Sequence, residues 1–140
     1  MAADDAISIA RPKAQVVLLY TRDGNLDALL GEALSGTGTI VLVARTVADA
    51  LQIVCQRGRE LTFALMDFDG GCRGMTILSA IHTCFEKLPI LVTTSKDAEH
   101  VSAVAYANGA RACFPKPTYP ARLANAISEI TAQGHQLAAA

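Results

Sequence analysis

Three residues of different chemical types each come directly after a short run of mostly apolar residues. These residues are Asp67, Thr94 and Lys116. A carboxylate, a hydroxyl and an ammonium together suit acceptance of a phosphoryl group, with the carboxylate as nucleophile and the other two binding the transferred oxygens. Each residue type alone is common in turns, strands or loops. The prediction therefore depends on the fold bringing all three together.

The elements that must do so alternate regularly along the chain. Short apolar runs begin near five residues: Val16, Thr39, Thr62, Leu88 and Arg111. Between them, apolar residues recur at helical spacing, and glycines follow the predicted helix ends. Five β-α units with short connections predict parallel strands, right-handed crossovers and a doubly wound α/β domain. The carboxyl ends of such strands share one edge, where we expect Asp67, Thr94 and Lys116 to meet.

Length and composition narrow the classes of protein. The chain has 140 residues, 51% of them hydrophobic, and carries 12 basic against 13 acidic residues. This predicts one ordered domain that does not bind nucleic acid through its charge. We expect a flexible lead-in over 1–13, the domain over 14–131, and a tail or linker start over 132–140. No targeting segment or apolar run of about 18 residues is evident, so no membrane association and a cytoplasmic location are expected.

The cysteines give no sign of a disulfide framework or a metal site. Cys55, Cys72, Cys84 and Cys113 include no C-x-x-C pair. Three of them fall on predicted apolar faces or strands, so buried free thiols are expected.

With these residues in place, the chain resembles the receiver domains of two-component response regulators over roughly residues 14–131. Three stretches carry the resemblance, at 63–67, 88–95 and 109–117, and the last contains Gly-Ala followed by Lys-Pro. The resemblance implies a (βα)5 fold with strand order 2-1-3-4-5.

The same resemblance assigns roles to individual residues. It implies that Asp67 is the phospho-acceptor, Thr94 the switch hydroxyl and Lys116 the family's lysine, with a cis Lys116–Pro117 bond. Thr93 takes the switch position if the register slips by one residue. Protein partners are implied, namely a histidine kinase or a downstream effector. A homodimer through the face formed by the fourth helix, fifth strand and fifth helix is also implied.

Several positions depart from the family's pattern. Receivers carry two acidic residues at the end of the first strand that bind Mg²⁺, and Thr21 and Arg22 align there. Asp23 and Asp69 remain as candidate metal ligands, whereas Arg22 would supply a fixed positive charge that pairs with Asp67 in place of the metal.

The family's aromatic switch position is also changed, because Cys113 stands there with Phe114 next to it. Together these departures fit a divergent or pseudo-receiver.

Three functional hypotheses remain. The first is a receiver-like module that signals through protein contacts, with weak or no phosphorylation and no enzymatic activity. The second is a working phospho-receiver that accepts a phosphoryl group from a histidine kinase on Asp67. The third is a flavodoxin-like ligand-binding domain, which the sequence disfavours because residues 21–25 contain no phosphate-binding loop.

Overall fold

The computed structural model describes residues 15–22, 24–69, 73–95 and 98–139, and the expected lead-in over 1–13 lies outside these ranges. In the described part, five parallel strands form one sheet in the order β2-β1-β3-β4-β5. The strands are β1 (Val16–Tyr20), β2 (Ile40–Ala44), β3 (Leu61–Asp67), β4 (Ile90–Thr94) and β5 (Ala112–Pro115). The predicted fold class and strand order are thus confirmed.

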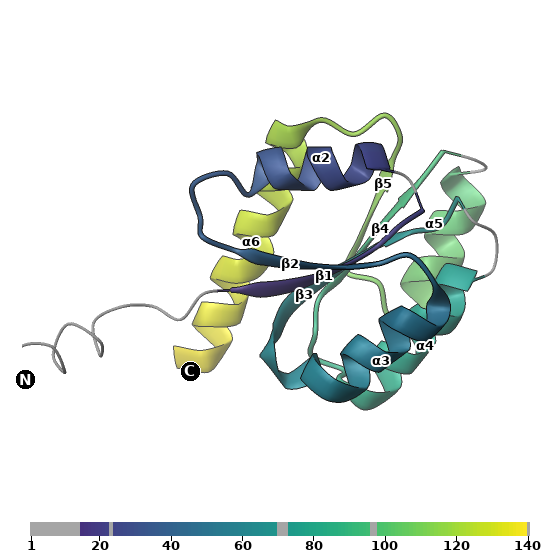
Figure 1. Ribbon diagram of the computed structural model, residues 1–140, viewed down its shortest axis with the longest axis horizontal. Coiled ribbons are helices and arrows are strands. Elements are labelled where there is room, and N and C mark those ends of the chain that lie inside the picture. The colour runs from purple at the N-terminus through teal and green to yellow at the C-terminus, as the bar shows by residue number, and fades with distance from the viewer. Residues whose placement is uncertain (1–14, 23, 70–72, 96–97, 140) are drawn as a thin grey trace, which may run out of the picture.

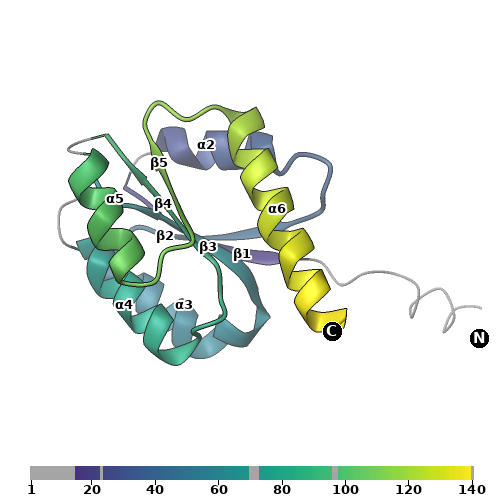
Figure 2. The same cartoon turned by 180° about the vertical axis from the view of Figure 1, so that it is seen from behind.

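Helices cover both faces of this sheet (Figures 1 and 2). They are α2 (Gly24–Ala33), α3 (Val47–Arg57), α4 (Arg73–Cys84), α5 (Ala98–Ala107) and α6 (Pro120–Ala139), with a short 3-10 turn, η1 (Gly58–Glu60). Helices α2 and α6 lie on one face, and α3, α4 and α5 lie on the other. Helix α6 continues past residue 131, where the sequence places the domain boundary, and the division into domain and tail stays a prediction.

The strands bury side chains on both faces because successive residues point to opposite sides of a sheet. On β1, Leu18 packs into the apolar layer beneath α3, α4 and α5, whereas Leu19 packs into the layer beneath α2 and α6. Every residue of β1 and β4 is buried. The sheet therefore holds its strand ends rigidly at one edge, which is what a precise polar site requires.

The prediction of buried thiols is wrong for two cysteines. Cys55 and Cys84 are exposed and Cys113 is partly buried, all as free thiols, and Cys72 lies outside the described residues. Helix α3 buries Ala50 and Val54. Because each helical residue is rotated by about 100° from the one before it, Cys55 points away from that buried stripe.

Candidate functional site at the carboxyl edge of the sheet

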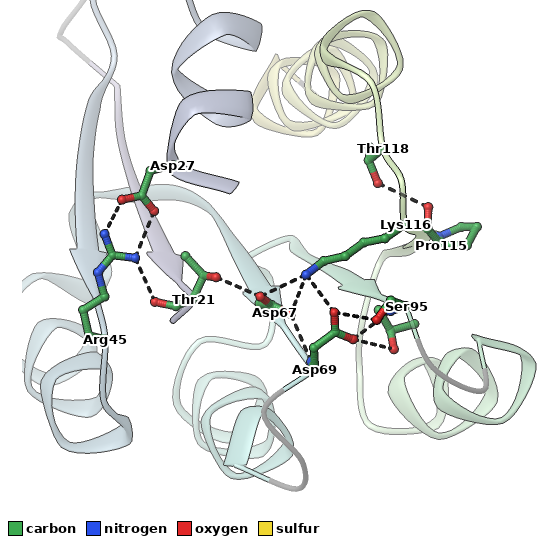
Figure 3. Close-up of polar contacts among 10 residues, drawn as sticks. Thr21, Asp27, Arg45, Asp67, Asp69, Ser95, Pro115, Lys116 and Thr118 are labelled. Carbon is green, nitrogen blue, oxygen red and sulfur yellow. Dashed lines mark hydrogen bonds and ion pairs between the residues drawn. The ribbon is translucent and has the colours of Figure 1, made fainter. Parts of the chain in front are cut away.

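Asp67, the last residue of β3, lies at the centre of a polar cluster (Figure 3). Its side chain is only 6% exposed. Oδ2 accepts a hydrogen bond from Thr21 Oγ1 at 2.8 Å, and Oδ1 accepts one from the Asp69 N–H at 3.0 Å. Thr21 comes directly after β1, which pairs with β3, so parallel pairing of two neighbouring strands creates the contact.

Lys116 comes directly after β5 and supplies the positive charge at this carboxylate. Its Nζ lies 3.3 and 3.2 Å from the two oxygens of Asp67 and 2.8 Å from Oδ2 of Asp69. Its backbone N–H donates to the carbonyl oxygen of Thr94 at 2.8 Å, which fixes the lysine beside the end of β4. The Lys116–Pro117 bond is cis, as expected.

Asp69 is the second carboxylate at Lys116, and both of its oxygens are engaged. Oδ1 accepts from the Ser95 N–H at 2.7 Å and from Thr94 Oγ1 at 3.3 Å, and Oδ2 accepts from Ser95 Oγ at 2.9 Å. Partial burial alone would raise the pKa of Asp69, but hydrogen bonds from Lys116 and Ser95 outweigh it, and the net pKa is lowered. Asp69 is therefore held as a carboxylate.

The same contacts raise the pKa of Lys116, so both groups are held in their charged forms. Partial burial would lower it, yet the contacts with Asp69 and Asp67 raise it above its ordinary value. The cluster thus has one ammonium between two carboxylates.

The structure distinguishes the two threonines at the end of β4. Thr94 directs its hydroxyl to Asp69 in the cluster. Thr93 is fully buried, and its Oγ1 has no hydrogen-bond partner among the described residues. Because consecutive strand residues point to opposite faces, only one of them can reach the cluster, and that residue is Thr94.

The expected pairing of Arg22 with Asp67 is not found. Arg22 is exposed, and among the described residues no ion pair joins it to Asp67. Thr21 is fully buried and points at Asp67, so the residue after it turns toward solvent. Lys116 supplies the charge that was expected from Arg22, and Asp23 lies outside the described residues.

Sequence reasoning missed Arg45, Asp27 and Ser95. Arg45 donates to the carbonyl oxygen of Thr21 at 3.1 Å and forms an ion pair with Asp27 on α2 (Figure 3). This contact supports the backbone of Thr21 from the β2 side. Arg45 and Asp27 lie in no recognisable motif, whereas Ser95 is the last residue of the 88–95 stretch and directly follows Thr94.

Residues 22–128 match the response regulator receiver domain family. The chain belongs to this family. Receiver domains are signalling domains of two-component systems rather than classical enzymes, and they interact with histidine kinases and effector domains. No curated protein sequence matches the chain.

Solved receiver structures have the same fold. A response regulator receiver domain protein from Clostridium thermocellum aligns with a TM-score of 0.78 at 19% identity, over 88% of this chain and 98% of that one. Another from Methanospirillum hungatei JF-1 gives 0.79 at 20% identity, over 89% and 98%. A response regulator from Thermotoga maritima gives 0.76 at 15%, over 86% and 99%.

Receiver domains commonly bind Mg²⁺ beside the phosphorylation site, but the described residues here do not fit that ion. Mg²⁺ prefers several oxygen ligands in octahedral geometry, many of them anionic. Asp67 and Asp69 already share the ammonium of Lys116, and the Thr21 hydroxyl donates into Asp67. No group of three or more acidic, His or Cys side chains in the described part of this receiver is arranged to hold a metal.

The aromatic position of this receiver is reorganised. Phe114 is buried in the layer beneath α2 and α6, with the Arg122 guanidinium 5.8 Å from its ring centroid. Cys113 points to the opposite face, and its N–H donates to the hydroxyl of Tyr106 on α5 at 3.1 Å. On the face of β5 where Cys113 stands in place of the family's aromatic, the ring that contacts the strand therefore comes from Tyr106 on α5.

No helix in the described ranges of this receiver is long and apolar enough to cross a membrane.

Proposed function

We propose that this receiver domain signals mainly through protein contacts, with Asp67 phosphorylated weakly or not at all. The supporting observation is the donor set around Asp67. Thr21, Lys116 and the Asp69 N–H all bind its oxygens, while Thr21 and Arg22 stand where the family has acids. These contacts support a site that keeps the proposed acceptor, hydroxyl and lysine, with no acidic pair at positions 21 and 22 to hold a metal.

The charges at the site support the proposal that phosphoryl transfer to Asp67 is slow. Lys116 is shared by Asp67 and Asp69, so the three side chains together carry a net charge of about −1. A phosphodonor brings further negative charge to the same edge. Without a metal ion or another cation to neutralise it, the transition state receives little electrostatic stabilisation. The 6% exposure of Asp67 also restricts access to its oxygens.

The alternative is a working phospho-receiver, which one observation favours. Asp67, Lys116 and the hydroxyl of Thr94 occupy one edge of one sheet, as phosphoryl acceptance requires. In this alternative an Asp67 oxygen attacks phosphorus, the bond from phosphorus to the donor's leaving group breaks, and the switch hydroxyl and ammonium bind phosphoryl oxygens. A histidine kinase would be the donor, with Asp23 and Asp69 as metal ligands.

Intact-mass measurement with a small phosphodonor separates the two proposals. We expect wild-type protein to gain little or no phosphoryl mass at saturating Mg²⁺. The double variant Thr21→Asp/Arg22→Asp restores two carboxylates, so it should gain mass faster, by about tenfold or more, since a bound metal supplies several kcal/mol of charge stabilisation. Asp67→Asn in that background is the control and should abolish the gain. Stoichiometric modification of wild type that disappears in Asp67→Asn would establish the working phospho-receiver.

Protein partners are proposed to dock on the face formed by α5, β5 and α6. Tyr106 on α5 and Tyr119, directly before α6, are 50% and 66% exposed, and aromatic side chains are enriched at protein interfaces. The proposed occupant of this face is a protein in the cytoplasm: a histidine kinase, an effector or a second copy of this receiver. We propose no direct contact with nucleic acid. Sedimentation equilibrium tests the homodimer: Tyr119→Ser should weaken self-association, and a monomeric wild type at all concentrations would exclude it.

A further inference from the structure

The carboxylate of Asp69 has more hydrogen-bond donors than a loop residue needs. Four donor atoms converge on it, from Thr94, Ser95 and Lys116. We propose that these three residues form an anion-binding site and that Asp69 is its built-in ligand, which holds this edge of the sheet in an anion-bound arrangement.

The geometry is that of a bound anion. Each oxygen of Asp69 accepts from two donors, with distances of 2.7 and 3.3 Å at Oδ1 and 2.9 and 2.8 Å at Oδ2. The donors are a backbone N–H, two hydroxyls and an ammonium. This is the mixture that proteins use for oxyanions such as phosphate.

The donors are also distant from Asp69 in sequence, which separates this arrangement from an ordinary turn. An aspartate in a turn binds backbone groups two residues away. Ser95 is 26 residues from Asp69, and Lys116 lies on a different strand end. The sheet therefore assembles the site from the ends of β4 and β5, and the loop after β3 delivers the carboxylate. The lowered pKa of Asp69 agrees with this, because it keeps the ligand charged.

Occupation of these donors by Asp69 also affects regulation, provided that Asp67 has its proposed phospho-acceptor role. Thr94 and Lys116 are the groups that would bind the oxygens of a phosphoryl group on Asp67, and Asp69 already occupies both. Such a group must displace Asp69 before it can use them. Unmodified protein therefore already has the donors arranged around an anion, and modification changes the arrangement little.

Removing the built-in ligand should free the site for a soluble anion. The experiment titrates inorganic phosphate into ¹⁵N-labelled wild type, Asp69→Ala and the matched control Asp49→Ala, which removes an exposed carboxylate on α3. In Asp69→Ala the Ser95 amide should show a saturable shift. Its apparent affinity should exceed that of wild type by about tenfold or more, because a tethered ligand competes at an effective concentration of millimolar or higher. Asp49→Ala should behave as wild type.

Two further variants keep the test decisive. Adding Lys116→Met to Asp69→Ala should abolish the phosphate-dependent shift, whereas adding Asp67→Asn should preserve it, since the binding is non-covalent. A folded Asp69→Ala protein that binds no phosphate would overturn the inference, as would wild type that binds equally well at Ser95. These outcomes do not depend on phosphorylation of Asp67, so failure here is distinct from failure of the proposed function.

Discussion

At the scale of single residues, the shared ammonium of Lys116 dominates the site. Asp67 is 6% exposed and Asp69 23%, and Lys116 is 21% exposed itself. A partly buried charge loses favourable hydration. Only close partners with good geometry compensate for the free energy that is lost. Removing one partner of such a group leaves an uncompensated charge. The stability of this edge should therefore depend on the charge states of all three residues.

Measuring the unfolding free energy of wild type and Asp69→Asn as a function of pH tests this expectation. The pKa of Asp69 is lower in the folded protein than its unfolded value of about 3.9. The carboxylate therefore stabilises the fold at pH values above that unfolded value, and this contribution is lost as the pH falls through the lower folded value. We expect the difference in unfolding free energy between wild type and Asp69→Asn to be constant from about pH 5 to 7 and to shrink below about pH 4.

Urea unfolding at a series of pH values measures this difference. Lys116→Met removes the main cause of the lowered pKa of Asp69. In this variant, too, the unfolding free energy should fall less than in wild type as the pH drops below about 4. A difference between wild type and Asp69→Asn that stays unchanged down to pH 3 would show that the Asp69 contacts contribute no charge-dependent stability.

At the scale of elements, short turns determine where the strand ends lie. The turn between α5 and β5 contains Gly109, with φ of +106°, a backbone conformation that residues other than glycine rarely adopt. It also packs closely, because a Cβ at this position would lie 2.5 Å from His82 Nδ1 on α4. This turn determines where β5 begins and hence where Lys116 emerges.

Gly109→Ala should therefore destabilise the protein by about 1–3 kcal/mol, from backbone strain and the clash with His82. Gly31→Ala on α2 is the matched control: a Cβ there meets nothing within 4 Å, and it should stabilise the helix by about 0.5–1 kcal/mol. Urea midpoints report both effects.

Adding His82→Ala to Gly109→Ala separates the two causes, since it removes the clash but keeps the backbone strain. Partial recovery of stability is expected. If Gly109→Ala is as stable as wild type, the turn does not constrain β5 as proposed.

At the scale of the whole molecule, two apolar layers share one sheet. Ile77 on α4 is fully buried in one layer, and Leu123 on α6 is fully buried in the other. Both layers pack against the same strands. Loss of either layer exposes one face of β1, β3 and β4, so the layers should unfold together.

Ile77→Ala and Leu123→Ala should each cost about 2–5 kcal/mol, as buried truncations do. In both variants the urea transitions followed by far-UV circular dichroism and by tyrosine fluorescence should coincide, because unfolding is expected to be two-state. Separate transitions for the two probes would show that one layer can unfold without the other.

The fold could be predicted from sequence because its signals are local and repeated. Apolar runs covered on both faces, helical spacing between them and glycines at turns each indicate the same architecture. The ends of β3 and β4 fall at Asp67 and Thr94 as predicted. The exposed Cys55 and Cys84 are the exceptions, because helix rotation by a single position decides burial.

For the site, the sequence by itself determined that Asp67, Thr94 and Lys116 would lie at one edge, since the ends of parallel strands must share it. Only the tertiary structure decided which charge meets which. Arg22 turns outward, Lys116 bridges both carboxylates, and Asp69 takes Thr94 and Ser95 as partners. Such pairings depend on where side chains from strands distant in sequence lie relative to one another, to within a few ångströms. No local sequence pattern encodes these positions.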